Sequence, residues 1–425
     1  MKKANLVLTA ALAAAGLVGV AAGTLVPATA LAAAATAKKP TLSAAVLPAL
    51  KATQDAVNAK NWDEALLHVQ EAQAVPGRTA YDDFQINDFL WFIQYQRKQL
   101  PEAAAALEQV VNSGFVPPEL LEQRLKAVTQ LNLAAKNYGK AIEYGNKYLA
   151  LNPSDQETAL QVAQAMYLNK DFAGAKAAAE KLVASGGKPS EDALKLVLRS
   201  NMDLKNDAGA LAALESLVRY YPEQKYWEDL LTNQLFRTKD DRALRHLYRL
   251  MNDTNTLDKA DEIGEMGSSL ITGGFPTEAK GVLERGIAAG VFSGDAKARA
   301  QADLDRARTQ AAADAKDLPN ADKALATAKT GNEMVATGKL YFSAGNYEKA
   351  ADAIQKGLAK GGVTDVDDAN MLLGIAYARS GKIAEGNAAF GNVKDAKFAD
   401  VSRLWKLKLE TVATTAAPAP APSAG

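Results

Sequence analysis

Small and hydrophobic residues recur along the chain with the spacing of amphipathic helices, and no strand-like alternation of apolar and polar residues persists. The pattern predicts pairs of helices joined by short turns, for example over 369–379 and 383–393. One such pair cannot bury its apolar face alone, so neighbouring pairs are expected to stack into an array. The predicted fold class is therefore all-α.

A longer period lies above the helical one. A polar, helix-breaking pair is followed by an apolar residue and, three positions later, by a small residue, as in KNWDEA, KNYGKA, KDFAGA and GNYEKA. These motifs and their weaker copies end at spacings of 38, 38, 34, 35, 33, 36, 71 and 36 residues, and the interval of 71 indicates a degenerate unit. The final small residues are Ala65, Ala103, Ala141, Ala175, Ala210, Ala243, Ala279, Ala350 and Gly386.

This period and these motifs resemble the tetratricopeptide repeat. The family signature also has a small residue twelve positions before the Ala and a Tyr three positions later, as at Gly338 with Tyr341 and at Gly374 with Tyr377. The resemblance spans roughly 47–393 and implies a right-handed superhelical solenoid of about eight to ten helix pairs. Segments such as LVRYYPEQKYWEDLL and GFPTEAKGVLERGIAAG, within 214–405, look like exported proteobacterial members of the family, which implies export but no reaction.

Composition divides the chain into five segments. Residues 1–32 are predicted to be a signal peptide, 42–294 an N-terminal array, and 295–331 a degenerate, charged helical segment that separates two lobes. Residues 332–410 are predicted to hold the C-terminal units and a capping helix, and 411–425, rich in Ala and Pro, a disordered tail.

The first segment predicts a periplasmic protein. Lys2 and Lys3 precede an uncharged apolar stretch, which is followed by A-x-A cleavage sites, so we expect the mature chain to begin between Leu31 and Lys38. The alternative is an uncleaved leader that tethers the protein to the membrane as a single helix. No membrane contact is expected unless the leader is uncleaved.

Charge and composition narrow the classes of partner. Lys and Arg together number 49, as do Asp and Glu, and no basic domain appears, so no nucleic-acid partner is expected. The chain has no Cys, and its two histidines, His68 and His246, lie far apart in sequence. We therefore expect no metal and no cofactor, and, because no catalytic motif is present, no enzymatic activity. An enzyme with a cryptic active site among the helices is the remote alternative.

The family resemblance points to a groove. In such arrays the first helix of each pair lines the concave face, where family members bind peptides. The corresponding aromatic, amide and basic residues suit an acidic polypeptide, and the alternative is that the aromatic ones serve packing. The positions carried over are Asp88, Phe92, Tyr95, Lys126, Gln130, Gln164, Tyr167, Lys195, Arg199, Thr232 and Phe236.

Binding is expected in the units before the charged segment, because the corresponding residues of the last unit, Met371, Ile375 and Ala378, are neither aromatic nor basic. The function predicted is a non-catalytic scaffold or adaptor of the bacterial cell envelope that binds a protein or peptide. The alternative is a membrane-tethered assembly factor for an envelope transport or secretion complex.

One second helix carries a basic stripe, formed by Arg242, Arg245, His246 and Arg249. We expect a solvated outer face, partly neutralised by the two acidic residues that precede it. The alternative is a site for anionic lipid head groups or a phosphorylated ligand.

Overall fold

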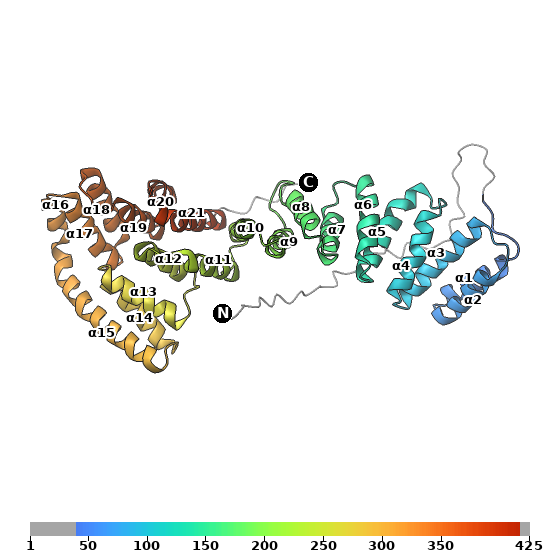
Figure 1. Ribbon diagram of the computed structural model, residues 1–425, viewed down its shortest axis with the longest axis horizontal. Coiled ribbons are helices and arrows are strands. Elements are labelled where there is room, and N and C mark those ends of the chain that lie inside the picture. The colour runs from blue at the N-terminus through green and yellow to red at the C-terminus, as the bar shows by residue number, and fades with distance from the viewer. Residues whose placement is uncertain (1–39, 417–425) are drawn as a thin grey trace. The chain divides into compact units, whose positions relative to one another are not determined.

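The computed structural model describes residues 40–416. The predicted signal peptide and the end of the predicted tail, 417–425, lie outside these residues. Every regular element in the described range is a helix, which confirms the predicted all-α class. The helices form two compact units, divided between Ile93 and Gln94 (Figure 1).

The smaller unit holds α1 (Leu47–Asn58), α2 (Trp62–Ala74) and most of α3 (Ala80–Gln96). Asp82 ties the unit together, because its buried carboxylate accepts hydrogen bonds from the backbone N–H groups of Ser43 and Thr79 at 2.9 and 2.8 Å. The apolar core comes from all three helices and consists of Val46, Leu50, Ala56, Ala65, Val69, Ala72, Ile86 and Ile93.

The larger unit begins with α4 (Leu100–Asn112) and continues as helix pairs. The helices of a pair pack on each other, and many second helices also pack on the first helix of the next pair. The regular pairs are α5 (Pro118–Ala134) with α6 (Tyr138–Leu151), α7 (Gln156–Leu168) with α8 (Phe172–Val183), α9 (Glu191–Asp203) with α10 (Asp207–Tyr220), α11 (Gln224–Arg237) with α12 (Asp241–Asp253), α13 (Ala260–Thr272) with α14 (Pro276–Ala288), α17 (Gly331–Ser343) with α18 (Tyr347–Lys360), and α19 (Val366–Arg379) with α20 (Ile383–Gly391).

Small residues set the distance between paired helices, as the repeat signature predicts. A Cβ added at Gly374 would lie 2.5 Å from the ring of Phe390, and one added at Gly338 would lie 2.5 Å from the side chain of Ile354. Each contact joins the predicted small residue to the apolar residue 16 positions later. The paired helices therefore cross closely at the positions that the repeat signature predicts.

The turn inside most pairs ends the first helix with a residue in the left-handed region. In the earlier pairs this residue is a lysine with φ between 56° and 67°, whereas in the later pairs it is a glycine with φ between 74° and 81°. Its N–H donates to the carbonyl three residues back, and the next N–H donates to the carbonyl five residues back, which closes the helix end. The lysines are Lys60, Lys98, Lys136, Lys170 and Lys205, and the glycines are Gly274, Gly345 and Gly381.

The charged segment over 295–331 does not separate two lobes. It forms α15 (Gly294–Asp317), a short 3-10 turn η1 (Leu318–Asn320) and α16 (Ala321–Thr327), and α15 packs on both α13 and α14. The residues Ala300, Leu304 and Ala307 of α15 are buried. These residues belong to one core that runs from Leu194 to Leu409, so the segment joins its neighbours instead of dividing them.

The last helix, α21 (Ala396–Ala416), is longer than the predicted cap. It covers α19 and α20, as expected, and also returns to pack on α10 and α12 (Figure 1). Its final turns enter the segment predicted to be a disordered tail. Helix persists there because Thr411 is buried and donates to the carbonyl of Lys408 at 2.8 Å, and because Ala favours helix.

Candidate functional site

Apart from Tyr95 on α3, the predicted groove residues of the larger unit lie on α5, α7, α9 and α11. Counted back from the residue that caps the second helix, they lie about eleven, seven and four positions earlier. One set, with Gln130, Gln164, Arg199 and Thr232, is half-buried. Within the described part of the chain, none of these four side chains makes a hydrogen bond or an ion pair with another protein group. The larger unit therefore offers one unpaired polar side chain on each of four consecutive first helices.

Three other predicted groove residues already have partners. Lys126 donates to Asp155 at 2.8 Å and joins α5 to the start of α7. The hydroxyl of Tyr167 donates to Asp203 at 2.6 Å, and burial together with this carboxylate raises the pKa of Tyr167 to about 12. These contacts link neighbouring pairs, so both side chains have a structural role.

Lys195 is the third predicted groove residue that already has partners. Its ammonium lies 2.8 Å from Glu191, one helical turn earlier, and 3.7 Å from Asp192. The carboxylate of Glu191 also accepts the hydroxyl of Tyr226, and these two hydrogen bonds, the first from Lys195, lower the pKa of Glu191 to about 2. Arg199 is therefore the basic groove residue that stays available, and Lys195 is not.

Another repeating position lies four residues before the residue that caps the second helix, and its large side chains are half-buried at Tyr95, Leu133 and Tyr167 and exposed at Met202 and Phe236. Phe236 is 72% exposed and Met202 is 52% exposed. Leu133 and Met202 were missed by sequence reasoning, although their constant distance from the caps Asn137 and Asn206 could have found them. We call this set the apolar row, which consists of Tyr95, Leu133, Tyr167, Met202 and Phe236.

The remaining predicted groove residues, Asp88 and Phe92, lie in the smaller unit. The carboxylate of Asp88 accepts the indole N–H of Trp91 at 2.9 Å. The ring of Phe92 meets those of Trp62 and Trp91 edge-on, at centroid distances of 5.8 and 5.9 Å. Phe92 therefore serves packing, which is the alternative that the sequence left open.

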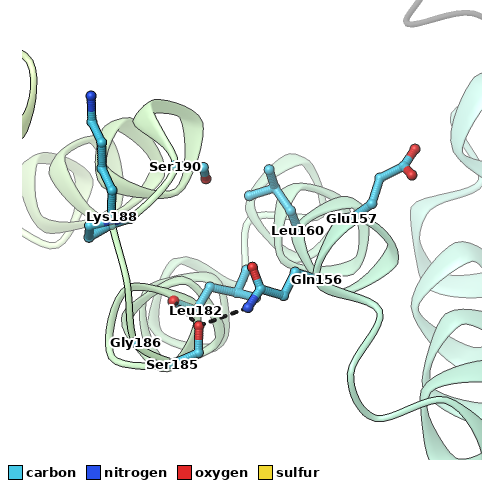
Figure 2. A pocket seen from close by; sticks show the side chains of 9 residues that line it. Gln156, Glu157, Leu160, Leu182, Ser185, Gly186, Lys188 and Ser190 are labelled. Atoms are coloured by element: carbon cyan, nitrogen blue, oxygen red, sulfur yellow. Dashed lines mark hydrogen bonds between the residues drawn. The ribbon is translucent and has the colours of Figure 1, made fainter. Parts of the chain in front are cut away.

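A small cleft of about 150 Å³ lies among the start of α7, the end of α8 and the turn before α9. Figure 2 shows Gln156 and Ser185 meeting across it, with the amide donating to the hydroxyl at 3.1 Å, whereas Glu157 and Lys188 point away from each other. The ammonium of Lys188 lies over the ring of Tyr221, 4.0 Å from its centroid. No pair of ionisable groups converges on this cleft, so its chemistry is that of a turn between repeats.

The basic stripe on α12 is not the solvated face that we expected. His246 and Arg249 are fully buried, and the guanidinium of Arg249 donates to Glu278 at 2.8 Å. Arg379 donates to the same carboxylate at 3.0 Å and also holds Asp253 through two hydrogen bonds of 3.0 Å. The prediction failed because the partners lie on α14 and α19, far away in sequence.

Histidine 246 belongs to the same buried network. Its Nε2 lies 2.9 Å from a carboxylate oxygen of Asp368, and its Nδ1 lies 3.2 Å from the guanidinium of Arg249. Burial lowers the pKa of His246, which keeps the ring neutral, so that Nε2–H donates to Asp368 and Nδ1 accepts from Arg249. The indole of Trp405 donates to the carbonyl of His246 at 3.0 Å, which fixes α21 on α12.

Glu278 remains ionised in this network. Burial alone would raise its pKa, but the charges of Arg249 and Arg379 outweigh burial and lower the pKa to about 2. Because the cluster satisfies its own charges, its chemistry is that of a structural clasp between distant repeats.

The last unit presents no open first helix. Residues 368–377 of α19 are all buried, among them Met371 and Ile375, which sequence reasoning placed at groove positions. Their neighbours include α12, α18, α20 and α21. The exposed groove positions of the larger unit therefore lie before α12.

Residues 40–416 lack two further features, a metal cluster and a membrane-spanning helix. No cluster of three or more metal-ligating side chains is found among them. None of the helices they form has the length and apolar character needed to cross a bilayer.

No protein-family model and no curated protein matches the chain. Solved structures resemble it at low identity. A tetratricopeptide repeat protein from Parabacteroides merdae is 15% identical, with 79% of this chain and 99% of that chain covered and a TM-score of 0.30. The Naa15/Naa10 complex bound to HypK-THB is 14% identical, covering 90% and 64%, with a TM-score of 0.42.

PilF from Pseudomonas aeruginosa is 16% identical, covering 44% of this chain and 97% of that chain, with a TM-score of 0.25. At such identities and TM-scores, these likenesses support no statement about activity or partner.

Proposed function

We propose that the protein is a non-catalytic scaffold that binds a polypeptide partner on the first helices α5 to α11. The observation that carries this proposal is the apolar row, whose last two members, Met202 and Phe236, are more than half exposed on consecutive first helices. An isolated exposed apolar side chain is ordinary, but a contiguous exposed set next to unpaired polar groups is typical of an interaction surface.

The polar neighbours of the row favour a polypeptide. Gln130, Gln164 and Arg199 present amide and guanidinium groups at the same position of successive first helices, and they have no partner among the described residues. Amide groups suit the N–H and C=O groups of an extended backbone, and Arg and aromatic residues are enriched in protein interfaces.

Site-specific photocrosslinking in intact cells tests this function. A photoreactive residue at Phe236 or Arg199 is expected to form a discrete covalent adduct with a second protein, identified by mass spectrometry. The matched control is Leu151, which is 50% exposed but lies at the end of a second helix. Equal adducts from Leu151 and Phe236, or none from any position, would contradict a groove on the first helices.

Arg199→Glu supplies a second test. The change reverses a charge that has no ion-pair partner, so helix content and melting temperature should be preserved while partner capture falls. Lys195→Glu is less suitable because it would place a carboxylate beside Glu191. Full capture by the folded Arg199→Glu variant would remove Arg199 from the site.

The location of this function is proposed as the bacterial cell envelope. The support is the sequence of residues 1–37, with its basic start, apolar stretch and A-x-A sites. N-terminal sequencing of the exported protein should give a start between Leu31 and Lys38. A product that keeps Met1 and stays with the membrane after alkaline washing would favour the tethered assembly factor instead.

A further inference from the structure

Four turns of the larger unit place a lysine where the backbone favours glycine. Lys98, Lys136, Lys170 and Lys205 adopt φ values between 56° and 67°. A residue with a Cβ is strained in this region by about 1–2 kcal/mol, whereas glycine is not. The chain itself shows that glycine serves the same turn, because Gly345 and Gly381 occupy it in later pairs. The turn therefore does not explain the lysines.

The lysine side chains have no structural partner. All four are exposed, and none makes an ion pair, a hydrogen bond or a cation–π contact with the described part of the chain. The acidic residues next to them are engaged elsewhere: the carboxylate of Asp171 accepts the N–H of Gly174 at 2.9 Å, and Asp203 accepts Tyr167. The exposed carboxylates of Glu102 and Asp207 follow two of the turns, but neither forms an ion pair with these lysines.

The lysines accompany the apolar row one by one. The N–H of each lysine donates to the carbonyl of the apolar-row residue three positions before it, at distances of 2.9–3.1 Å, so each lysine belongs to the same turn as one apolar-row residue. We call the four the lysine row. Its pairs with the apolar row are Lys98 with Tyr95, Lys136 with Leu133, Lys170 with Tyr167, and Lys205 with Met202.

The turns that carry glycine differ from the lysine turns in the exposure of the neighbouring apolar side chain. Gly274 and Gly345 donate in the same way to Ile271 and Phe342, at 3.2 and 3.0 Å, but these two apolar residues are only 6% and 1% exposed. Lysine thus occupies turns whose neighbouring apolar side chain is half-buried or exposed, whereas two of the three glycine turns follow a buried side chain and the third, Gly381, follows half-buried Ala378. The lysine turns therefore coincide with the more open first helices.

We infer that the lysine row and the apolar row together bind an extended, acidic polypeptide segment that also carries apolar side chains. The inference rests on the proposed function and specifies its partner. The first helices α5 and α7 contact each other, as do α7 and α9. Contacting helices lie about 8–10 Å apart and an extended chain advances about 3.3 Å per residue, so the step from one of these first helices to the next corresponds to about three residues of the partner. We expect acidic side chains about every third residue, with apolar ones between them.

A protruding row of lysines beside apolar groups would also suit an anionic lipid surface. The one-to-one pairing of charge and apolar group in successive repeats favours a linear partner, because a bilayer presents no register for such a pairing to match. Vesicle binding is therefore treated as an alternative outcome of the test.

The test compares three forms of the full chain: the wild type, the triple variant Lys136→Gly/Lys170→Gly/Lys205→Gly, and the triple variant with Arg at the same positions. The glycine variant removes three charges and relieves the backbone, so it should fold. The arginine variant keeps both charge and strain. A random library of 16-residue peptides is selected on the wild type, and each enriched peptide is synthesised with a fluorescent label and titrated against all three forms by anisotropy.

Enriched peptides are expected to carry Asp or Glu about every third residue. Their affinity should fall on the order of tenfold in the glycine variant, recover in the arginine variant and weaken at high salt, since each exposed ion pair contributes a factor of about 1.5–5. Equal affinity for wild type and glycine variant, or enrichment without acidic residues, would overturn the inference.

The remaining outcomes are also decisive. Self-association of the glycine variant with unchanged peptide affinity would mean that the lysines only maintain solubility. Binding of phosphatidylglycerol vesicles, dependent on the lysines and without peptide enrichment, would assign the rows to a membrane. If the glycine variant keeps its crosslinked partner while Arg199→Glu loses it, the inference fails but the proposed function stands. If a photoreactive residue at Phe236 gives no adduct in an otherwise wild-type chain, both the inference and the proposed function fail.

Discussion

The repeats from α5 to α11 and those from α12 to α21 are built from the same helix pair, but their first helices face different surroundings. In the earlier repeats, Met202 and Phe236 are more than half exposed and Arg199 has no partner within the described residues. In the later repeats, ten consecutive residues of α19 are buried.

The first helix α19 is buried because α12, α18, α20 and α21 all pack on it. A helix pair therefore serves either as an open surface or as a wall of a closed core, depending on what folds back over it.

The charges follow the same division. In the earlier repeats, ion pairs lie near the surface, within one helix as for Lys147 with Glu143 at 3.0 Å, or between neighbouring pairs as for Lys126 with Asp155 at 2.8 Å. In the later repeats, Arg249, Glu278 and Arg379 join three helices in the interior. Removing one member of a buried set leaves its partners uncompensated, whereas an exposed pair contributes little.

The largest expected effect is therefore that of Glu278→Gln. It leaves the guanidinium groups of Arg249 and Arg379 buried without their shared carboxylate, and we expect the free energy of unfolding to fall by about 3–5 kcal/mol. The matched change in the open repeats, Glu143→Gln, should cost no more than about 1 kcal/mol. Urea titrations of both variants measure this difference, and similar losses would show that the clasp is no stronger than a surface pair.

Overpacking comes next in size. Ala141, Ala175 and Ala350 occupy the same position of their pairs and are at most 1% exposed. Replacing any of them by Leu should destabilise the fold by about 1–3 kcal/mol, because the added atoms force the paired helices apart. Thermal unfolding of the three variants tests whether open and closed repeats share this packing. Unchanged melting at Ala141 and Ala175 would mean that the assigned repeat position is wrong.

The sequence predicted what repeats locally. The period, the all-α class and the small residues at helix crossings all depend on residues within about two repeats, and all are confirmed. The closure of the later repeats was missed because it depends on contacts over more than 100 positions, such as His246 with Asp368. A basic stripe gives the same helical pattern on an outer face and in a buried network.

The site was predicted to a similar extent. The position along each first helix followed from the repeat, and Phe236 and Arg199 stay predicted binding residues. The engagement of Lys126 by Asp155 and of Lys195 by Glu191 depends on side-chain geometry that the pattern does not contain.

The next prediction concerns the buried network of the later repeats, which should make the stability of the fold depend on pH. Burial lowers the pKa of His246, so below the ordinary value of 6.5 the unfolded chain binds a proton that the folded chain does not. Stability should therefore fall as the pH decreases from 6.5 towards 5.5, by up to about 1.4 kcal/mol per pH unit, and His246→Gln should remove this slope.

Half-buried His68, on α2 of the smaller unit, is the control because its pKa is raised, mainly by its hydrogen bond with Glu71. Its contribution is present below 6.5 and lost at higher pH, which is the opposite sign. Urea midpoints at pH 7.5, 6.5 and 5.5 measure both effects. A slope that persists in His246→Gln would show that another group titrates in this window.

The smallest expected effect concerns the turns themselves. Lys170→Gly in an open repeat should stabilise the fold by up to about 1 kcal/mol, because relief of left-handed strain exceeds the added entropy of the unfolded chain. The reciprocal change, Gly345→Lys in a closed repeat, imposes the same strain and should destabilise by about 1 kcal/mol. Nothing lies within 4 Å of a Cβ built at Gly345, so steric overlap adds nothing to this cost. A higher free energy of unfolding in Lys170→Gly and a lower one in Gly345→Lys, both measured by urea titration, would show that the lysines are retained at an energetic cost. A lower free energy of unfolding in Lys170→Gly would mean that the lysine stabilises its own turn, which would weaken the case for a binding role.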